Sequence, residues 1–160
     1  MGNVVKMPMV MQMESVECGA ASLTMILAHY GKWLPLEKVR AACGVSRNGS
    51  SAKDIVVAAR KYGLEAEGYQ VTPEALEGMQ PAIIHWNFNH FVVFRGFKKG
   101  NACLNDPNAG PIEVPFDDFR KSFTGVALTF APTEAFEKEG HRTRILSYVR
   151  KYLQGAGEAF

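Results

Sequence analysis

Cys18 is the residue whose type and position most directly suggest catalysis, because a thiolate is a strong nucleophile. It opens a run of helix-forming residues, 18–30, so its sulfur would lie at a helix N-terminus. There the helix dipole and the free N–H groups of the first turn stabilise a thiolate. Gly19 follows it and would leave room for a substrate backbone beside the sulfur. A buried structural cysteine is the alternative interpretation of this position taken alone.

A thiol nucleophile needs a base, and the sequence offers four histidines. His29 lies near the other end of the same helix, about 16 Å away along its axis. His141 lies in a charged segment, and His85 lies near the end of an apolar run. His90 opens the run HFVVF after a polar turn, and a histidine at the mouth of a strand can face a helix N-terminus. We therefore predict His90 as the base, with a turn or core histidine as the alternative.

Asp106 is the residue best placed to orient His90. The tetrapeptide 98–101 is a hairpin turn signal, and a hairpin folded there brings positions 90 and 106 to the same end. Asp106 also precedes a proline, where Asp commonly begins a turn, and both interpretations can hold together. Gln12 could join the Cys18 backbone N–H in binding an oxyanion. The order Gln, Cys, His, Asp is that of papain-like folds, in which the nucleophile helix precedes the sheet.

Other kinds of site find no support in the sequence. Cys43 and Cys103 lack metal-ligand spacing with any histidine, and we expect both to be core residues. The sequence contains no glycine-rich phosphate loop and no dinucleotide fingerprint. We therefore expect this part of the chain to use neither a metal nor a cofactor.

Length and composition indicate one ordinary globular domain. The chain has 160 residues, of which 47% are hydrophobic and 21% charged, and its net charge is +2. A charge bias this small does not suggest a nucleic-acid partner. Three cysteines form no disulfide framework and suit a reducing compartment. No run of 18 apolar residues is present, so we expect no membrane span within this sequence.

The elements that must position these residues follow from periodicity, caps and turn signals. Helices are expected first, and β-rich runs follow after Gly63, which predicts an α+β fold with N-terminal helices packed on an antiparallel sheet. The expected helices are 18–30, 36–43, 52–62, a short one from Thr72-Pro73, and 115–123, with Ser51 capping the third. The expected strands are 64–69, 81–86, 90–97, 101–105, a short run at 112–114, and 125–131.

Two stretches resemble the motifs of the bacteriocin-processing peptidases, the N-terminal domains of peptidase-containing ABC transporters. QMESVECGAASLTMILAHYG, 12–31, resembles the cysteine motif, and HFVVFRGFKKGNACLNDP, 90–107, resembles the histidine motif with its closing Asp-Pro. The likeness covers roughly residues 7–131. Glu14 departs from it, because many members carry aspartate there.

The resemblance implies a papain-like cysteine endopeptidase with Cys18 as nucleophile, His90 as base, Asp106 as orienting residue and Gln12 as oxyanion donor. Its implied substrate is a bacteriocin or lanthipeptide precursor, recognised through an amphipathic leader helix and cut after Gly-Gly or Gly-Ala. Export would follow through the transmembrane and nucleotide-binding domains of a parent transporter, and ATP would serve only the latter. The implied location is the cytoplasmic side of the bacterial cell membrane. A module that binds leaders without cutting them is the alternative, and a papain-like acyltransferase would share the same triad.

The resemblance also divides the chain into a cysteine peptidase domain, 1–132, and a segment, 133–160, that leads toward a transmembrane domain. Within that segment, residues 143–153 place an apolar stripe on one helical face, with basic residues around it. A helix this short is marginal alone in water. We therefore expect it to dock on another surface, and we expect the chain to self-associate through it.

Overall fold

The computed structural model describes residues 3–140, in which helices precede a single antiparallel sheet. The expected α+β order is confirmed. The helices are α1 (Cys18–His29), α2 (Leu36–Cys43), α3 (Ala52–Lys61) and α4 (Phe116–Ser122), with single 3₁₀ turns η1 (Ser15–Glu17) and η2 (Glu74–Leu76). The strands are β1 (Leu64–Gln70), β2 (Ala82–Trp86), β3 (His90–Lys98), β4 (Asn101–Asp106), β5 (Gly110–Pro115) and β6 (Phe123–Pro132).

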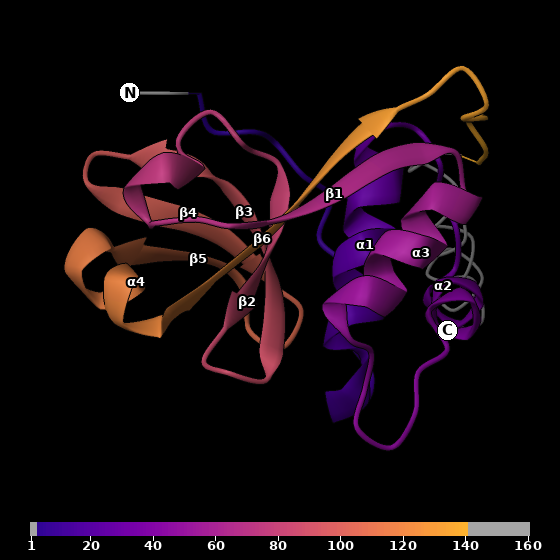
Figure 1. The fold of residues 1–160 in the computed structure, drawn as a ribbon, viewed down its shortest axis with the longest axis horizontal. Helices are drawn as coiled ribbons and strands as arrows, with labels where there is room; N and C mark the ends of the chain where they lie inside the picture. The colour runs from indigo at the N-terminus through magenta and orange to yellow at the C-terminus, as the bar shows by residue number, and fades with distance from the viewer. Residues whose placement is uncertain (1–2, 141–160) are drawn as a thin grey trace, which may run out of the picture.

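The sheet of the described residues has the strand order β1-β6-β2-β3-β4-β5, and every neighbouring pair is antiparallel. Figure 1 shows β1 and β6 crossing the molecule from the helical side to the strand-rich side. The β3–β4 turn contains Lys99 and Gly100, both with positive φ, as the turn signal predicted. This register aligns Val93 with Asn105, so β3 begins close to where β4 ends.

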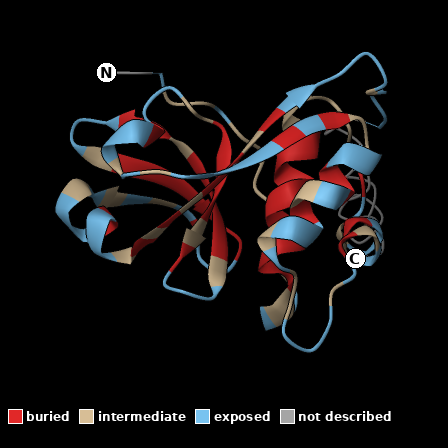
Figure 2. Ribbon diagram, viewed as in Figure 1, coloured by how far each residue is buried: buried red, intermediate tan, exposed pale blue. Residues whose placement is uncertain are grey.

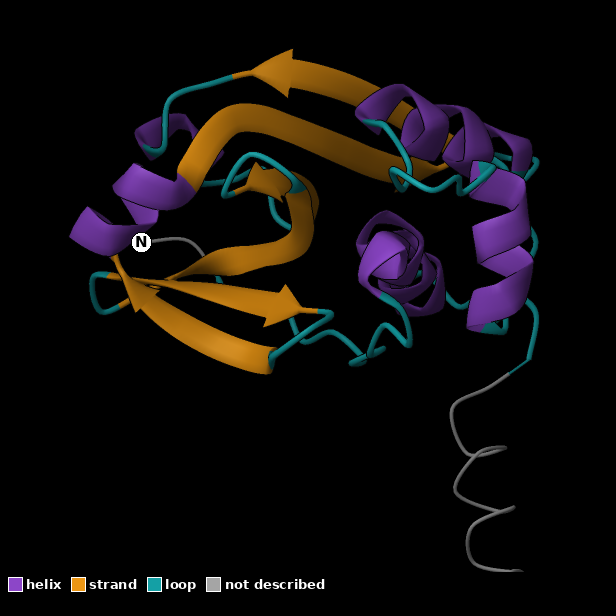
Figure 3. Ribbon diagram, turned by 90° about the horizontal axis from the view of Figure 1, so that it is seen from below, coloured by secondary structure: helices purple, strands orange, loops and turns teal. Residues whose placement is uncertain are grey.

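The first three helices gather at one side of the sheet, as seen in Figures 1 and 3. Helix α1 packs against α2, α3 and β3, and all its residues except His29 are buried. An all-round apolar helix is stable only when neighbours cover every face. Figure 2 accordingly shows α1 and the central strands as the main buried regions. Cys18, the candidate nucleophile, therefore lies at the N-terminus of a helix that is packed on all sides.

A second core lies on the strand-rich side, where α4 and η2 pack against the sheet. Phe119 is fully buried there and contacts the rings of Phe94, Phe97 and Phe123. Burial of aromatic side chains contributes strongly to stability. This cluster stabilises β3 and β4 on the side of the molecule away from the first three helices.

The N-terminal segment before η1 lies as an extended strap against the sheet. Val5 N–H donates to the carbonyl of Arg95 at 2.8 Å, and Asn105 Nδ2 donates to the carbonyl of Pro8 at 3.3 Å. Gly96 has a φ of 133°, and a Cβ there would lie 2.8 Å from the carbonyl oxygen of Asn3. Glycine at this bulge therefore admits the strap that leads to Gln12.

Residues 133–140 follow β6 and lie against the helical side. Phe136 packs on the core between the first three helices and the sheet. Trp33 N–H donates to the carbonyl of Glu139 at 2.7 Å. The division of the chain at residue 132 stays a prediction. No helix within residues 3–140 is long and apolar enough to cross a membrane. The predicted amphipathic helix at 143–153 lies outside the described residues.

Candidate active site

Cys18 is the first residue of α1, as its sequence position predicted. Its residue is 7% exposed, and η1 leads directly into it. The first-turn N–H groups of a helix have no partners within the helix. At the N-terminus of α1 they are therefore available to stabilise negative charge near the Cys18 sulfur. Glu17 occupies the N-cap position of α1 without a side-chain cap bond, whereas at η1 its side chain forms a capping box with Glu14. Its carboxylate turns back to earlier residues instead.

His90 and Asp106 meet at one end of the β3–β4 hairpin. His90 Nε2 lies 2.7 Å from Asp106 Oδ1. Asn108 N–H donates to the same carboxylate oxygen at 2.8 Å, which holds Asp106 in the turn before the next strand. The sequence prediction that the hairpin brings positions 90 and 106 together is therefore confirmed. The Asp-Pro turn and the contact with His90 coexist, as the sequence allowed.

The surroundings of His90 favour its charged form. Burial lowers the pKa of His90, but hydrogen bonds to Asp106 and Cys18 and the charges of both residues outweigh it, raising the pKa to about 9. Burial raises the pKa of Asp106, but the bond from His90 and the N–H of Asn108 leave it lowered overall. Because the carboxylate accepts from Nε2, Nδ1 is the ring nitrogen left for Cys18. The histidine thus bridges the thiol and the carboxylate.

We expect His90 to titrate near pH 9 when the ring proton resonances are followed by NMR. The folded pKa lies above the ordinary value of 6.5, so its contribution to stability is present below that value and lost as pH rises through about 9. Asp106→Asn should move the midpoint to lower pH, because it removes the charge and weakens the bond. His29 serves as an internal reference, since burial lowers its pKa and it lies at the far end of α1. A His90 midpoint at or below 6.5 in the parent chain would contradict this geometry.

Gln12 approaches the same place from the N-terminal strap. Its backbone N–H donates to the carbonyl of Pro107 at 2.9 Å, which ties the strap to the turn after Asp106. Its side-chain Oε1 is buried and meets no hydrogen-bond donor among the described residues. Gln12 also lines the hollow beside His90 and Asp106. All four predicted site residues thus lie around one place.

Gly19 has a role different from the predicted one. A Cβ at this position would lie 2.9 Å from Ile55 Cδ1 and 3.5 Å from Phe91 Cδ2. The small residue therefore allows α1 to pack against α3 and β3, rather than leaving space for a substrate. The expectation of substrate room at Gly19 is wrong, because close packing between elements uses that space.

Three adjoining hollows form a groove that begins at the site. The first, of about 420 Å³, is lined by His90, Asp106 and Gln12, and it shares Asn89 with the second. The second shares Ala52 and Val126 with a third between α3 and β1. Beyond the site the second hollow places Phe88 and Phe91 among polar residues, and the third is lined mainly by apolar ones, Val56, Tyr69, Val126 and Leu128. We refer to the second and third hollows together as the apolar groove.

Sequence reasoning did not find the apolar groove. Its lining comes from four stretches, 48–56, 68–70, 85–91 and 126–128, that are distant in the chain. The structure gives a local sign of it, since Phe88, in the turn just before His90, has a φ of 69° and is 85% exposed. A bulky residue with positive φ in an exposed turn is an outlier that points to function.

The remaining cysteines differ from Cys18 in their surroundings. Burial and the charge of Asp54 raise the pKa of Cys43 to about 11. Burial and Glu113 raise the pKa of Cys103 as well. Both are buried, as predicted. In residues 3–140, no three His, Cys, Asp or Glu side chains gather as a metal ion would require.

Comparisons with known proteins identify a family and relatives for this chain. The model of the peptidase C39 family matches residues 6–135. The colicin V secretion/processing ATP-binding protein CvaB of Escherichia coli is 33% identical over 141 residues, which are 88% of this chain and 20% of that protein. The lacticin-481/lactococcin-DR transport/processing ATP-binding protein of Lactococcus lactis is 27% identical over 92% of this chain and 22% of its own length. The chain thus spans about a fifth of these curated relatives.

Solved structures give the same picture. A double glycine motif protease from an AMS/PCAT transporter, crystallised with the leader peptide, is 57% identical and has a TM-score of 0.79 over 81% of this chain and 94% of its own. The peptidase domain of Streptococcus ComA, a bifunctional ABC transporter, is 25% identical with a TM-score of 0.74 over 80% of this chain and 98% of its own. The papain-like α+β fold predicted from the sequence is confirmed.

Proposed function

We propose, from the premise that this chain belongs to the peptidase C39 family, that it is a cysteine endopeptidase that removes leader peptides. The cut would follow a Gly-Gly or Gly-Ala pair in a bacteriocin or lanthipeptide precursor. The observation that carries the proposal is the alignment of Cys18, His90 and Asp106 at the mouth of the groove, with His90 Nε2 2.7 Å from Asp106 Oδ1. The matching family and the leader-bound protease support it.

In the proposed reaction Cys18 is the nucleophile and His90 manages its proton. Cys18 and His90 share one mobile proton, which stays on Nδ1 of His90 while the sulfur attacks the carbonyl carbon of the glycine before the cut. His90 then donates that proton to the leaving amine, and a thioester remains. Water, deprotonated by His90, hydrolyses the thioester and restores the thiol. Asp106 keeps the ring oriented throughout by accepting from Nε2.

The negative charge that develops on the carbonyl oxygen needs donors at fixed positions. The backbone N–H of Cys18 belongs to the free first turn of α1. The Nε2 group of Gln12 is the second candidate, because its Oε1 is buried. We propose that these two groups bind the oxyanion, a role worth roughly 10²–10³ in rate for a side-chain donor.

The apolar groove supplies the place for the leader. A helical leader would lay its apolar face on Val56, Tyr69 and Leu128, with its C-terminal end reaching His90 past Phe88 and Asn89. Residues without side chains at the cut can pass between the groove and Cys18. Binding energy from the remote helix would then position a short Gly-Gly segment for attack.

The parent protein would be a peptidase-containing ABC transporter, as the names of the curated relatives suggest. The proposed partners are its transmembrane and nucleotide-binding domains, and the proposed location is the cytoplasmic side of the cell membrane. Cleavage there would release the core peptide to the transport path.

The proposal is tested with a synthetic precursor that carries an amphipathic leader ending in Gly-Gly. We expect a single cut after the second glycine, identified by mass spectrometry, and none when that glycine is replaced by leucine. A bare tetrapeptide with the same Gly-Gly pair should show at least about 10²-fold lower kcat/KM, because it lacks the helix that binds the groove. An intact full-length peptide would refute the peptidase, whereas equal cleavage of the tetrapeptide would refute leader docking.

A further inference from the structure

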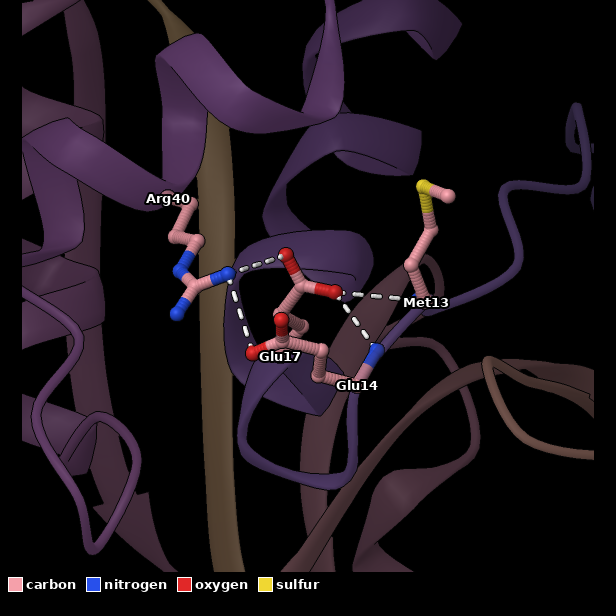
Figure 4. Close-up of polar contacts among 4 residues, drawn as sticks. All are labelled: Met13, Glu14, Glu17 and Arg40. Carbon is pink, nitrogen blue, oxygen red and sulfur yellow. Dashed lines mark hydrogen bonds and ion pairs between the residues drawn. The ribbon is translucent and has the colours of Figure 1, made fainter.

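Glu17 is a buried carboxylate that the proposed reaction does not use, although it directly precedes Cys18. Its side chain is 5% exposed. Figure 4 shows its two oxygens pointing in different directions, one to the chain at Met13 and Glu14 and the other to Arg40. Burying a carboxylate is costly unless it is paired and hydrogen-bonded. This one is satisfied on both oxygens, which indicates a built arrangement.

The first oxygen closes the loop that leads into α1. Oε1 accepts from the N–H of Met13 at 3.0 Å and from the N–H of Glu14 at 2.7 Å. Charge-assisted bonds of this kind are stronger than those between neutral groups. Glu17 thereby holds the two residues that follow Gln12 against the N-terminus of α1.

The second oxygen is held by α2. Arg40 Nη1 lies 3.1 Å from Glu17 Oε2 and 3.2 Å from Glu14 Oε2. Arg40 is about one-third exposed, so it reaches from the surface to the buried carboxylate. The guanidinium keeps Glu17 charged and turned toward the loop. We call Glu17 and Arg40 together the latch.

The latch acts on a loop that is also bound next to Gln12 from the opposite side. Gln12 N–H donates to the carbonyl of Pro107, directly after Asp106. Consecutive N–H groups at residues 12, 13 and 14 are therefore all bound, one to the Asp106 turn and two to Glu17. Hydrogen bonds thus connect the backbone at Gln12 both to the turn after Asp106 and to the residue before Cys18.

We infer that Glu17, charged and oriented by Arg40, is a positioning residue that sets the place of the Gln12 amide relative to the Cys18 N–H. The inference rests on the proposed function, because those two groups are the proposed oxyanion donors. A donor helps only when it lies within hydrogen-bond distance of the place where the oxyanion forms. Glu17 touches neither substrate nor reacting atoms, and it acts through Gln12.

Glu17→Ala should therefore lower kcat for the full leader substrate by about 10- to 10²-fold, as expected for a small displacement of a catalytic donor. KM should stay within about threefold, because the apolar groove does not involve the latch. Glu17→Gln should give a kcat between those of the parent and Glu17→Ala, since its amide oxygen can still accept from Met13 and Glu14 but its NH2 group would face Arg40 Nη1. Glu74→Ala, which removes an exposed acid paired with Arg120 beside the second core, is the control and should match the parent.

A double-mutant cycle separates positioning from a general loss of packing. In a Gln12→Ala background, Glu17→Ala should cost roughly threefold or less, because the group on which it acts is already gone. If the loss of kcat in the double variant equals the product of the two single losses, Glu17 does not act through Gln12. Unchanged kcat in Glu17→Ala would overturn the inference altogether. Near-ultraviolet circular dichroism of Glu17→Ala and Glu17→Gln checks that both variants are folded.

Amide hydrogen exchange gives a readout that needs no turnover. Protection of the Met13 and Glu14 amides should fall in Glu17→Ala and fall less in Glu17→Gln, while the Gln12 amide bonded to Pro107 should keep more of its protection. If the parent chain cuts no Gly-Gly substrate, the proposed function fails, and exchange alone then decides the latch. Unchanged protection of Met13 and Glu14 in Glu17→Ala would overturn it.

Discussion

Cys18→Ala is expected to abolish leader cleavage while leaving leader binding intact. The substitution removes the sulfur that would form the thioester, and no other described cysteine can replace it. Burial raises the pKa of Cys43 to about 11, and the pKa of Cys103 is also raised, so both thiols stay protonated near neutral pH. The apolar groove lies beyond the site and is untouched by the change. Turnover by mass spectrometry and leader affinity by fluorescence anisotropy measure the two effects separately.

The matched controls for this variant are Cys43→Ser and Cys103→Ser. Both should retain turnover, although each places a hydroxyl in a buried position and should lower the melting temperature. Iodoacetamide should label one cysteine rapidly in the parent and in both controls, and none rapidly in Cys18→Ala. Uniformly slow labelling of the parent chain, together with intact substrate, would favour the non-cleaving leader-binding module. Cleavage by Cys18→Ala near the parent rate would reject Cys18 as the nucleophile.

His90→Ala is expected to reduce kcat as completely as Cys18→Ala, by at least about 10⁴-fold, because nucleophile and base act as a unit. His90 holds the proton that it shares with Cys18 and later donates it to the leaving amine, so without His90 neither half of the reaction proceeds. The Cys18→Ala/His90→Ala double variant should be no slower than either single variant. Single-turnover assays at high enzyme concentration measure these low rates.

His29→Ala is the histidine control for this series. His29 lies at the far end of α1, where its ring contacts Tyr30, away from the hairpin that carries His90. Its replacement should change kcat little. A His90→Ala chain that retains kcat within tenfold of the parent would show that another group serves as base. His85 would be the first to test, because its pKa already responds to the charge of His90.

The link between His90 and Asp106 was readable from the sequence because it is local. Lys98–Asn101 carries turn residues, and a short turn sets the register of both strands that leave it. A spacing of sixteen residues across that turn then places the two side chains at one end. The helices were readable for a similar reason, since glycines at 31, 44 and 63 take positive φ where the first three helices end.

The uses of Gly19 and Glu17 could not be read in this way. Glycine beside the nucleophile suggested room for a substrate, but Ile55 and Phe91 fill that space from other elements. Nothing in the sequence around Glu17 indicated its contact with Arg40, which comes from α2 and binds the carboxylate together with the backbone of Met13 and Glu14. In each case the contacting residues lie in distant segments of the chain, and only tertiary packing brings them close to Gly19 or Glu17.

The sequence by itself thus determined the order of elements, the hairpin that joins His90 to Asp106, and the helix that begins at Cys18, because periodicity, caps and turns act over a few residues. Tertiary structure decided how α1 meets the sheet, and so placed Cys18 beside His90. It also assembled the apolar groove from α3, β1, β6 and the turn before β3. The position of Cys18 relative to His90 and the shape of the groove depend on how side chains pack in the two hydrophobic cores. Close packing is a property of the whole chain rather than of any segment.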